Sequence, residues 1–377
     1  MVFQRFPFIF AALLLALLAC SKSEETQGGG NPDLFRVNSI SKEWGMGGDI
    51  LEISGSGFGT DASLLDAVFV LSSPVDTLFG DITRVTPNRL TVRVPHMYTT
   101  GGISVFIVRD KQVSDKFPFT CDIDAVDSTS IVKSEWTTTA IKEGIIWRKA
   151  SFEAFESKQN VHVVEIDQSK VTEMGLLYSS PVGTRKRTSS FADQVDATVA
   201  INGSYYSAGK ASIGHLRVNG VDVENGTNWN DRINASLVIK DNELSIHYLG
   251  TSRYNETSRE LVGEHVMACG PSLLVDGTYI KTLKPDDAHV LARHPRTAVG
   301  VTADNKVLLV TVDGRQPGFS EGLNLRELSV VMRALEAKNA MNLDGGGSTT
   351  MYIKGSGVVN SISDAAERSV ANVLYMK

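Results

Sequence analysis

The sequence predicts two folded parts, an all-β immunoglobulin-like sandwich over residues 33–121 and an α+β domain over residues 122–377. The chain has 377 residues, of which 42% are hydrophobic and 21% charged, and this is more than one hydrophobic core usually holds. The first part alternates short β-rich segments with turn residues, whereas the second mixes strand-like runs with a clear helical pattern. These observations separate the two parts and give each its fold class.

Five short segments of the first part have the period-two character of strands. They are rich in β-branched and aromatic residues and recur at the spacing of a small antiparallel sandwich, at 35–37, 50–54, 67–70, 90–94 and 103–108. The stretch from Gly48 to Gly59 and the Val94-Pro95 pair resemble the IPT/TIG immunoglobulin-like module. The resemblance implies a spacer and, as the alternative, a module that binds glycans.

Residues 1–20 have the pattern of a targeting segment that is not part of the fold. The segment begins with a basic residue, Arg5, and continues with an apolar stretch that is short for a membrane span. It ends with Leu-Leu-Ala-Cys at Cys20. This resembles a bacterial lipobox, in which Cys20 carries the lipid. Residues 21–32 are polar and glycine-rich and predict a flexible tether. Their acidic start resembles the export signal of Bacteroidetes-type lipoproteins, so we expect an outer-membrane lipoprotein that faces outward, with a periplasm-facing orientation as the alternative.

In the second part, two predicted strands end in an acid followed by glycine. One strand runs into Asp313-Gly314, and the other runs into Asp344. Asp344 is followed by a glycine turn made of Gly345, Gly346, Gly347 and Ser348. Glycines let backbone N–H groups approach a ligand, so we expect an anion-binding nest beside a carboxylate. The alternative is a tight structural turn capped by Asp344.

Between the two acids, residues 324–335 have apolar side chains at helical spacing on one face. Asn324 and, three residues later, Glu327 have the spacing of a capping box. We therefore interpret Glu327 as a helix cap rather than as a catalytic acid.

Residues 140–377 resemble the phosphodiester glycosidase family. The resemblance rests on three motifs in order, Arg-Thr-Ala-Val-Gly from Arg296, Asp-Gly-Arg from Asp313 and Asn-Leu-Asp-Gly-Gly-Gly-Ser from Asn342. It implies a hydrolase that cleaves the glycosidic bond of a sugar-1-phosphodiester, with N-acetylglucosamine as one candidate sugar. Where the family usually has Asn-Gly-Gly-Phe-Phe, this chain has Asn202-Gly203-Ser204-Tyr205-Tyr206, which keeps the Asn and two aromatic residues.

The resemblance and the residue types together give each candidate residue a role. We assign Asp344 as nucleophile or general base and Asp313 as its partner or as an acid that orients a metal, and retention or inversion stays open. A phosphomonoester leaves with little need for a proton, so one carboxylate can suffice. Arginine is the residue best suited to bind the phosphate, because its planar guanidinium forms two parallel charge-assisted hydrogen bonds. The candidates are Arg296, Arg315 and Arg368.

Three residues are expected to form the sugar wall, because tyrosines stack on sugar rings and Asn binds hydroxyl or N-acetyl groups. They are Asn202, Tyr205 and Tyr206. His215 is a candidate acid, since the unperturbed pKa of histidine lies near neutrality. We expect no obligatory cofactor, but carboxylate oxygens at strand ends suit calcium or magnesium, so Asp313 and Asp344 are candidate ligands of a divalent cation.

Composition limits the other classes of function. A net charge of −6 argues against binding to nucleic acid. No Cys/His cluster has zinc-ligand spacing, and we expect Cys121 and Cys269 to be unpaired. Two alternatives to the glycosidase stay open, an inactive glycan-binding lipoprotein and a phosphodiesterase acting on phosphate-containing cell-wall polymers.

Overall fold

The structure is a computed structural model. It describes residues 34–45, 49–72, 75–95, 102–121, 127–155, 157–226, 232–250, 254–279 and 288–377. The targeting segment, Cys20 and the tether lie outside the described residues, so the lipoprotein and its outer-membrane location stay predictions. Within the described ranges, no helix is long and apolar enough to cross a membrane.

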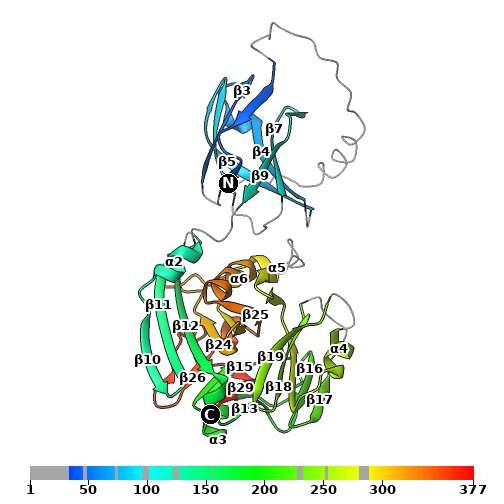
Figure 1. The fold of residues 1–377 in the computed structure, drawn as a ribbon, viewed down its shortest axis with the longest axis vertical. Helices are drawn as coiled ribbons and strands as arrows, with labels where there is room; N and C mark the ends of the chain where they lie inside the picture. The colour runs from blue at the N-terminus through cyan, green and yellow to red at the C-terminus, as the bar shows by residue number, and fades with distance from the viewer. Residues whose placement is uncertain are drawn as a thin grey trace.

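The strands of residues 34–121 form one β body, which Figure 1 shows in blue to cyan apart from a larger body in green to red. Its strand order is β1-β3-β6-β5-β4-β7-β9-β2, with β8 beside β7. The elements are β1 (Arg36–Ile40), β2 (Trp44–Gly45), β3 (Ile50–Ser56), η3 (Ala62–Leu64), β4 (Leu65–Ser72), β5 (Val75–Thr86), β6 (Arg89–Arg93), β7 (Gly102–Arg109), β8 (Gln112–Val113) and β9 (Phe117–Cys121).

The long strand β5 joins the two halves of this body. Its first half pairs with β4 and its second half, from Asp81, pairs with β6. The sequence pattern misses β5 because Gly80 interrupts its alternation, although the five expected strands all form. The pairing is antiparallel except between β2 and β9.

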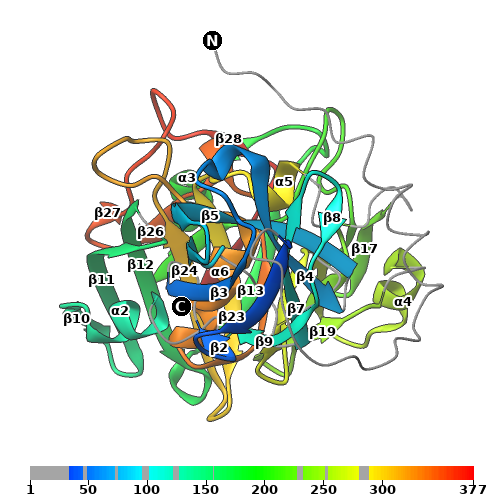
Figure 2. The same cartoon turned by 90° about the horizontal axis from the view of Figure 1, so that it is seen from above.

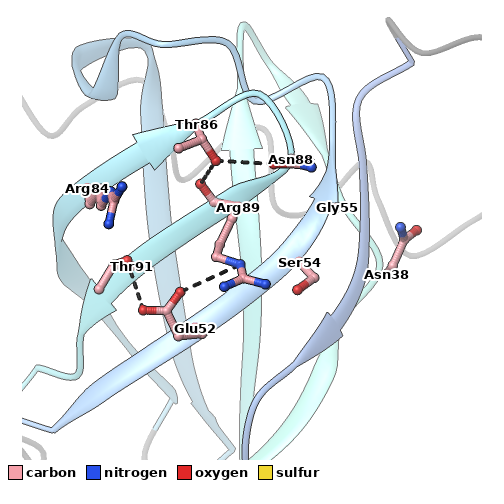
Figure 3. A pocket seen from close by; sticks show the side chains of 9 residues that line it. All are labelled: Asn38, Glu52, Ser54, Gly55, Arg84, Thr86, Asn88, Arg89 and Thr91. Carbon is pink, nitrogen blue, oxygen red and sulfur yellow. Dashed lines mark hydrogen bonds and ion pairs between the residues drawn. The ribbon is translucent and has the colours of Figure 1, made fainter.

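Successive side chains on these strands point alternately into the core and away from it. Leu51 and Ile53 of β3 are fully buried, whereas Glu52 and Ser54 line a groove of about 510 Å³ on the opposite face. Figure 3 shows that the groove is polar, with Glu52 between Thr91 and Arg89. The choice between a spacer and a glycan-binding module stays a prediction.

The larger body contains one long sheet and two smaller ones. The long sheet has the order β10 (Thr137–Lys142), β11 (Ile145–Ala154), β12 (Ser157–Asp167), β24 (Lys306–Val312), β23 (Arg296–Thr302), β25 (Ala337–Asn342), β21 (Ser272–Val275) and β22 (Thr278–Tyr279). The second sheet is β13 (Met174–Tyr178), β29 (Asn372–Met376), β15 (Val199–Asn202), β26 (Met351–Ile353) and β27 (Gly357–Val358). The third is β17 (Val221–Asn225), β16 (His215–Val218), β20 (His265–Cys269), β18 (Ala235–Lys240) and β19 (Glu243–Tyr248), and β14 (Lys186–Arg187) pairs with β28 (Ser369–Val370).

Helices cover the long sheet on one face, and the smaller sheets cover it on the other. Val299, Leu309 and Met341 face a core shared with the smaller sheets, whereas Ala298 and Leu308 face the helical side. Both faces of the central strands are thus buried, which explains their nearly continuous apolar runs. Helices α2 (Asp127–Lys133), α5 (Ala288–Leu291) and α6 (Leu325–Ala334) lie on the long sheet, whereas α3 (Thr188–Val195) packs on the second sheet and α4 (Tyr254–Glu260) on the third; η4 is Gln168–Lys170. Figure 2 places β10 and β11 at one side of the body and α4 and β17 at the other.

Several local predictions can be compared with these elements. The capping box of α6 is confirmed, because Asn324 and Glu327 exchange side-chain to backbone bonds. Val195 ends α3 and Asp196 follows with a left-handed φ of 56°, so the strand that leads into Asn202 begins only at Val199. The fold is mostly β, so the helices of the expected α+β domain are a smaller part of it than the prediction suggests.

Candidate functional site

The two Asp-Gly motifs lie at one edge of the long sheet. Strands β24 and β25 are both antiparallel to β23, which lies between them, so the two run in the same direction. Val312 pairs with Arg296 and Asn342 with Ala298, so both strands end beside the start of β23. Because β23 separates β24 from β25, Asp313 and Asp344 are two strand spacings apart, which is about 10 Å between their backbones. The prediction that two strands deliver their acids together is thus consistent with the topology.

A buried hydrogen-bond network fixes the backbone of Asp344. Its N–H donates to Gly203 O at 3.0 Å, and Asn202 Nδ2 donates to its carbonyl at 2.6 Å. Asn202 Oδ1 accepts from Thr297 Oγ1 at 2.8 Å and from Thr350 N at 3.0 Å. The Asn202 amide is fully buried and engaged by protein groups. The structure therefore places Asn202 as a support of Asp344 rather than on an open sugar-binding surface.

The carboxyl of Asp344 has a perturbed pKa. Burial raises this pKa to about 6, while the nearby Ser348 hydroxyl, the hydrogen bond from the Gly345 N–H and the charge of Arg368 act in the opposite direction. A carboxyl group with a pKa near 6 changes its protonation state close to neutral pH, as groups that transfer protons or attack substrates often do.

The backbone N–H groups of the glycine turn are bonded within the protein. Gly345 N donates to Asp344 Oδ1 at 3.0 Å and Gly346 N to Pro295 O at 2.8 Å. Ser348 N donates back to Gly345 O at 3.2 Å, which closes the short helix η5 (Gly346–Ser348). The expected anion-binding nest therefore has most of its donors already in use, and the positive charge must come from side chains.

Two arginine side chains supply that charge at the turn. A Cβ added to Gly346 would lie 3.0 Å from Arg315 Nη2, and one added to Gly347 would lie 2.5 Å from Arg368 Cζ. A side chain at either position would displace a guanidinium group, because both guanidinium groups lie directly on the turn. Gly346 also needs its positive φ of 62°.

The three candidate arginines have different environments. Arg315 is exposed, with Nη2 3.3 Å from His294 Nδ1, and Arg368 is exposed and paired with Asp364 at 2.6 Å. Arg296 is only 1% exposed and burial lowers its pKa to about 10. Its guanidinium donates to the carbonyls of residues 289, 292 and 323 at 2.8–3.0 Å. Arg315 and Arg368 can reach a ligand, whereas Arg296 holds loops together beneath the turn.

The two tyrosines of the expected sugar wall have separate surroundings. Tyr205 packs against the core, and its hydroxyl accepts from Asn342 Nδ2 at 2.8 Å and lies 2.7 Å from Gly270 O. Burial, with the charges of Cys269 and Asp344, raises its pKa well above the ordinary value. Tyr206 donates to the carbonyl of residue 369 at 3.2 Å and stacks under a guanidinium.

The structure does not bring His215 to the glycine turn. His215 lies on β16 of the third sheet and is fully buried. Its Nδ1 is 2.9 Å from Ser258 Oγ and its Nε2 is 3.0 Å from Asp222 Oδ1. Burial lowers its pKa. These partners hold the His215 side chain within the third sheet and not at the glycine turn.

Asp313 is fully buried among groups that sequence reasoning did not assign to the site. Its Oδ1 accepts from Ser361 N at 2.9 Å, its Oδ2 accepts from Asn160 Nδ2, and His162 Nε2 lies 3.7 Å from Oδ2. Asn160 and His162 are two residues apart and share one face of β12. No local sequence pattern brings His162 to Asp313; the pairing of β12 with β24 does so.

Metal-ligand and thiol chemistry can be assessed for part of the chain. Among the residues that the structure describes, no three His, Cys, Asp or Glu side chains group as metal ligands, and the divalent cation stays a prediction. Cys269 is a buried free thiol whose pKa burial raises to about 12. The side chain of Cys121 lies outside the described residues.

Comparison with known proteins supports the family of the second part. Residues 196–377 match the family model described as Phosphodiester glycosidase. The chain is 34% identical over 101 residues to the SPbeta prophage-derived uncharacterized protein YomE of Bacillus subtilis (strain 168), which is 25% of this chain and 15% of that protein. It is 42% identical over 60 residues to N-acetylglucosamine-1-phosphodiester alpha-N-acetylglucosaminidase of Mus musculus, which is 16% of this chain and 11% of that enzyme. The chain thus spans less than a sixth of these curated relatives.

A solved structure shows a related fold. The catalytic domain of the zebrafish N-acetylglucosamine-1-phosphodiester alpha-N-acetylglucosaminidase, auto-inhibited by its pro-peptide, superposes with a TM-score of 0.52 at 20% identity. The match covers 64% of this chain and 87% of that one. At this identity the likeness concerns the fold.

Proposed function

We propose that the second part of the chain is a hydrolase that cleaves the glycosidic bond of a sugar-1-phosphodiester. The main observation behind the proposal is the position of the Asp344 carboxyl, which has a pKa of about 6 and lies at a glycine turn. The guanidinium groups of Arg315 and Arg368 lie against this turn. A carboxylate beside two guanidinium groups suits a substrate whose leaving group is a phosphate ester.

In this proposal, the phosphate lies against the turn and the arginines neutralise its charge. Asp344 in its ionised form attacks the anomeric carbon or activates a water molecule, and the phosphomonoester leaves with little need for a proton. Asn202 fixes the Asp344 backbone. Preorganised charge of this kind commonly supplies the largest share of transition-state stabilisation.

N-acetylglucosamine is the first sugar to test. The mouse and zebrafish proteins are named for the removal of this sugar from a 1-phosphodiester. Tyr205 and Tyr206 follow Asn202 in this chain, where the family usually has two phenylalanines. Their hydroxyls bond to backbone carbonyls, so a difference in sugar preference would arise from loop shape.

The setting of the enzyme is part of the proposal. Cys20 would attach the chain to the outer membrane, and residues 33–121 would hold the hydrolase away from it as a spacer. The substrate is then a glycan with phosphodiester-linked sugars outside the cell or in the periplasm.

Product analysis tests the reaction. The protein is incubated with a synthetic methyl diester of N-acetylglucosamine-1-phosphate, and the proposal predicts free sugar and methyl phosphate. Sugar-1-phosphate and methanol would instead indicate a phosphodiesterase, and no turnover of any sugar-1-phosphodiester would favour the inactive glycan-binding alternative. Asp344→Asn, which removes the charge with little change in volume, should abolish turnover in a folded protein.

A further inference from the structure

The polar groove of the first β body has the size of a binding site. Its volume of about 510 Å³ falls within the range of about 300–1,000 Å³ typical of small-molecule sites. The proposed reaction uses none of the residues around it. Each described residue that lines the groove is polar or glycine and none is aromatic; they are Asn38, Glu52, Ser54, Gly55, Arg84, Thr86, Asn88, Arg89 and Thr91.

Two β-bulges shape this face of the sheet. In β1, Asn38 is an extra residue between two that pair with consecutive residues of β3. In β5, Thr83 is the extra residue, directly before Arg84. A bulge bends its strand and re-aims the neighbouring side chains, and Asn38 and Arg84 both line the groove. The groove therefore lies between irregularities in two strands and is not a feature of a regular sheet.

Two arginines of the groove can act on the same ligand. Arg84 pairs across the strands with Thr91, and Arg89 precedes Thr91 by two residues on β6, so the two arginine side chains lie on one face. Diagonal neighbours of this kind are about 7–8 Å apart, within reach of long side chains. Among the residues that the structure describes, Arg84 has no hydrogen-bond or ion-pair partner, as Figure 3 shows for the groove. Arg89 Nε lies 4.0 Å from Glu52 Oε2, so both exposed guanidinium groups can bind an anion.

The lining of the groove suits a sugar that has an acidic group. Two arginines outweigh the single carboxylate of Glu52, which accepts from Thr91 Oγ1 at 2.9 Å, in a chain whose net charge is −6. The planar guanidinium matches a carboxylate or a phosphate. The hydroxyl and amide side chains around the arginines can bond to sugar hydroxyls. A neutral sugar would find no aromatic ring to stack on among the described lining residues, so an acidic sugar fits better.

We propose that this groove binds an acidic oligosaccharide, with a carboxylate or phosphate held between Arg84 and Arg89. The hydroxyls of the sugar bond to the neighbouring hydroxyl and amide side chains. This binding does not depend on the proposed reaction, and it adds a second role to the spacer. Because both parts belong to one chain, a polymer held in the groove is kept at a raised local concentration for the second part.

The first test measures binding to the full chain by calorimetry with two pairs of tetrasaccharides. One pair is tetragalacturonate and its uncharged methyl ester, and the other is maltotetraose with one 6-phosphate and plain maltotetraose. None of them contains a sugar-1-phosphodiester, so the proposed reaction does not consume them. At least one acidic member should bind about tenfold or more tightly than its neutral counterpart, and the pair that does so identifies the acidic group. Added salt should weaken this binding. Binding of neither acidic member, or equal binding of acidic and neutral members, would overturn the inference.

The second test changes the charges of the groove in both directions. Arg84→Ala/Arg89→Ala should weaken binding of the acidic tetrasaccharide about tenfold or more, and Arg84→Lys/Arg89→Lys should restore only part of the loss, because lysine lacks the planar fork. Glu52→Gln, which removes the opposing charge, should strengthen binding about threefold. Lys111→Gln removes an exposed charge at the turn between β7 and β8, outside the groove, and is the matched control that should change nothing.

All four proteins should melt at the wild-type temperature, because the changed side chains are at least partly exposed. Wild-type binding by the double alanine variant would overturn the inference. So would an equal loss in Lys111→Gln, or unchanged or weaker binding in Glu52→Gln.

Discussion

Replacing Gly347 by Ala should slow the enzyme without unfolding it. Gly347 has no left-handed φ, so alanine fits its backbone. The added Cβ would lie 2.5 Å from Arg368 Cζ and would also collide with Asp364 Oδ2. Ordinary contact needs about 3.5–4.0 Å, so the Arg368–Asp364 pair must move by about 1 Å or more. A displacement of this size at a positioning group can cost about 100-fold in rate, and we expect kcat/KM to fall about 10- to 100-fold.

The assay follows kcat/KM for the sugar-1-phosphodiester together with thermal unfolding. The colliding atoms belong to exposed, flexible side chains, so the free energy of unfolding should change by about 0.5 kcal/mol or less. Gly345→Ala is the matched comparison, because its Cβ would lie 2.8 Å from the backbone carbonyl of Pro295, which cannot swing aside. That variant should lose about 1–3 kcal/mol of stability.

A double-mutant cycle identifies the cause. Arg368→Ala alone should be as slow as Gly347→Ala, and the combined variant should be little slower than either, since both changes remove one interaction. Wild-type kcat/KM in a folded Gly347→Ala protein would refute the reasoning that Arg368 must lie on the turn. Fully additive losses would show that Gly347 acts in some other way.

Three further results are expected. Because burial raises the Asp344 pKa to about 6, kcat/KM should rise with pH through that value and reach only about a tenth of its plateau at pH 5. A carboxyl whose pKa is higher in the folded than in the unfolded protein stabilises the fold below pH 4, and this stabilisation is lost as the pH rises through 6. Asp344→Asn should therefore melt at a higher temperature than the wild type at pH 7 but not at pH 3.5. Arg315→Lys should lower kcat/KM about tenfold with an unchanged melting temperature, whereas Arg296→Lys should lower the melting temperature because lysine cannot reach three backbone carbonyls, and the opposite pattern would exchange their roles. Cys20→Ala should move the protein from the membrane fraction to the soluble fraction, and a variant that still sediments after a salt wash would exclude a lipid on Cys20.

The sequence predicted those features of the site that depend on local patterns. Apolar runs that end in Asp placed strands β24 and β25 and the acids after them, and the helix cap at Glu327 followed from three-residue spacing. The turn at Asp241-Asn242 between β18 and β19 was also predictable, because both residues readily adopt positive φ and do so here at 52° and 61°.

The features that were missed depend on which strands pair. His162 and Asn160 reach Asp313 only because β12 pairs with β24, about 150 residues later in the chain. Residue type alone also did not distinguish the arginines. Arg296 is buried under backbone carbonyls, while Arg315 and Arg368 lie on the glycine turn. Long-range packing sets such environments, and no local pattern encodes them.

The central claim is that the chain breaks the bond between an anomeric carbon and its oxygen with Asp344 at the glycine turn. Hydrolysis of a sugar-1-phosphodiester in ¹⁸O-labelled water tests it most directly, with rapid quenching and mass analysis of both products. We predict that the label enters the anomeric hydroxyl of the free sugar, that the phosphomonoester carries none, and that Asp344→Asn forms neither product. Label in the phosphomonoester would mean that water attacks phosphorus, and the protein would then be a phosphodiesterase.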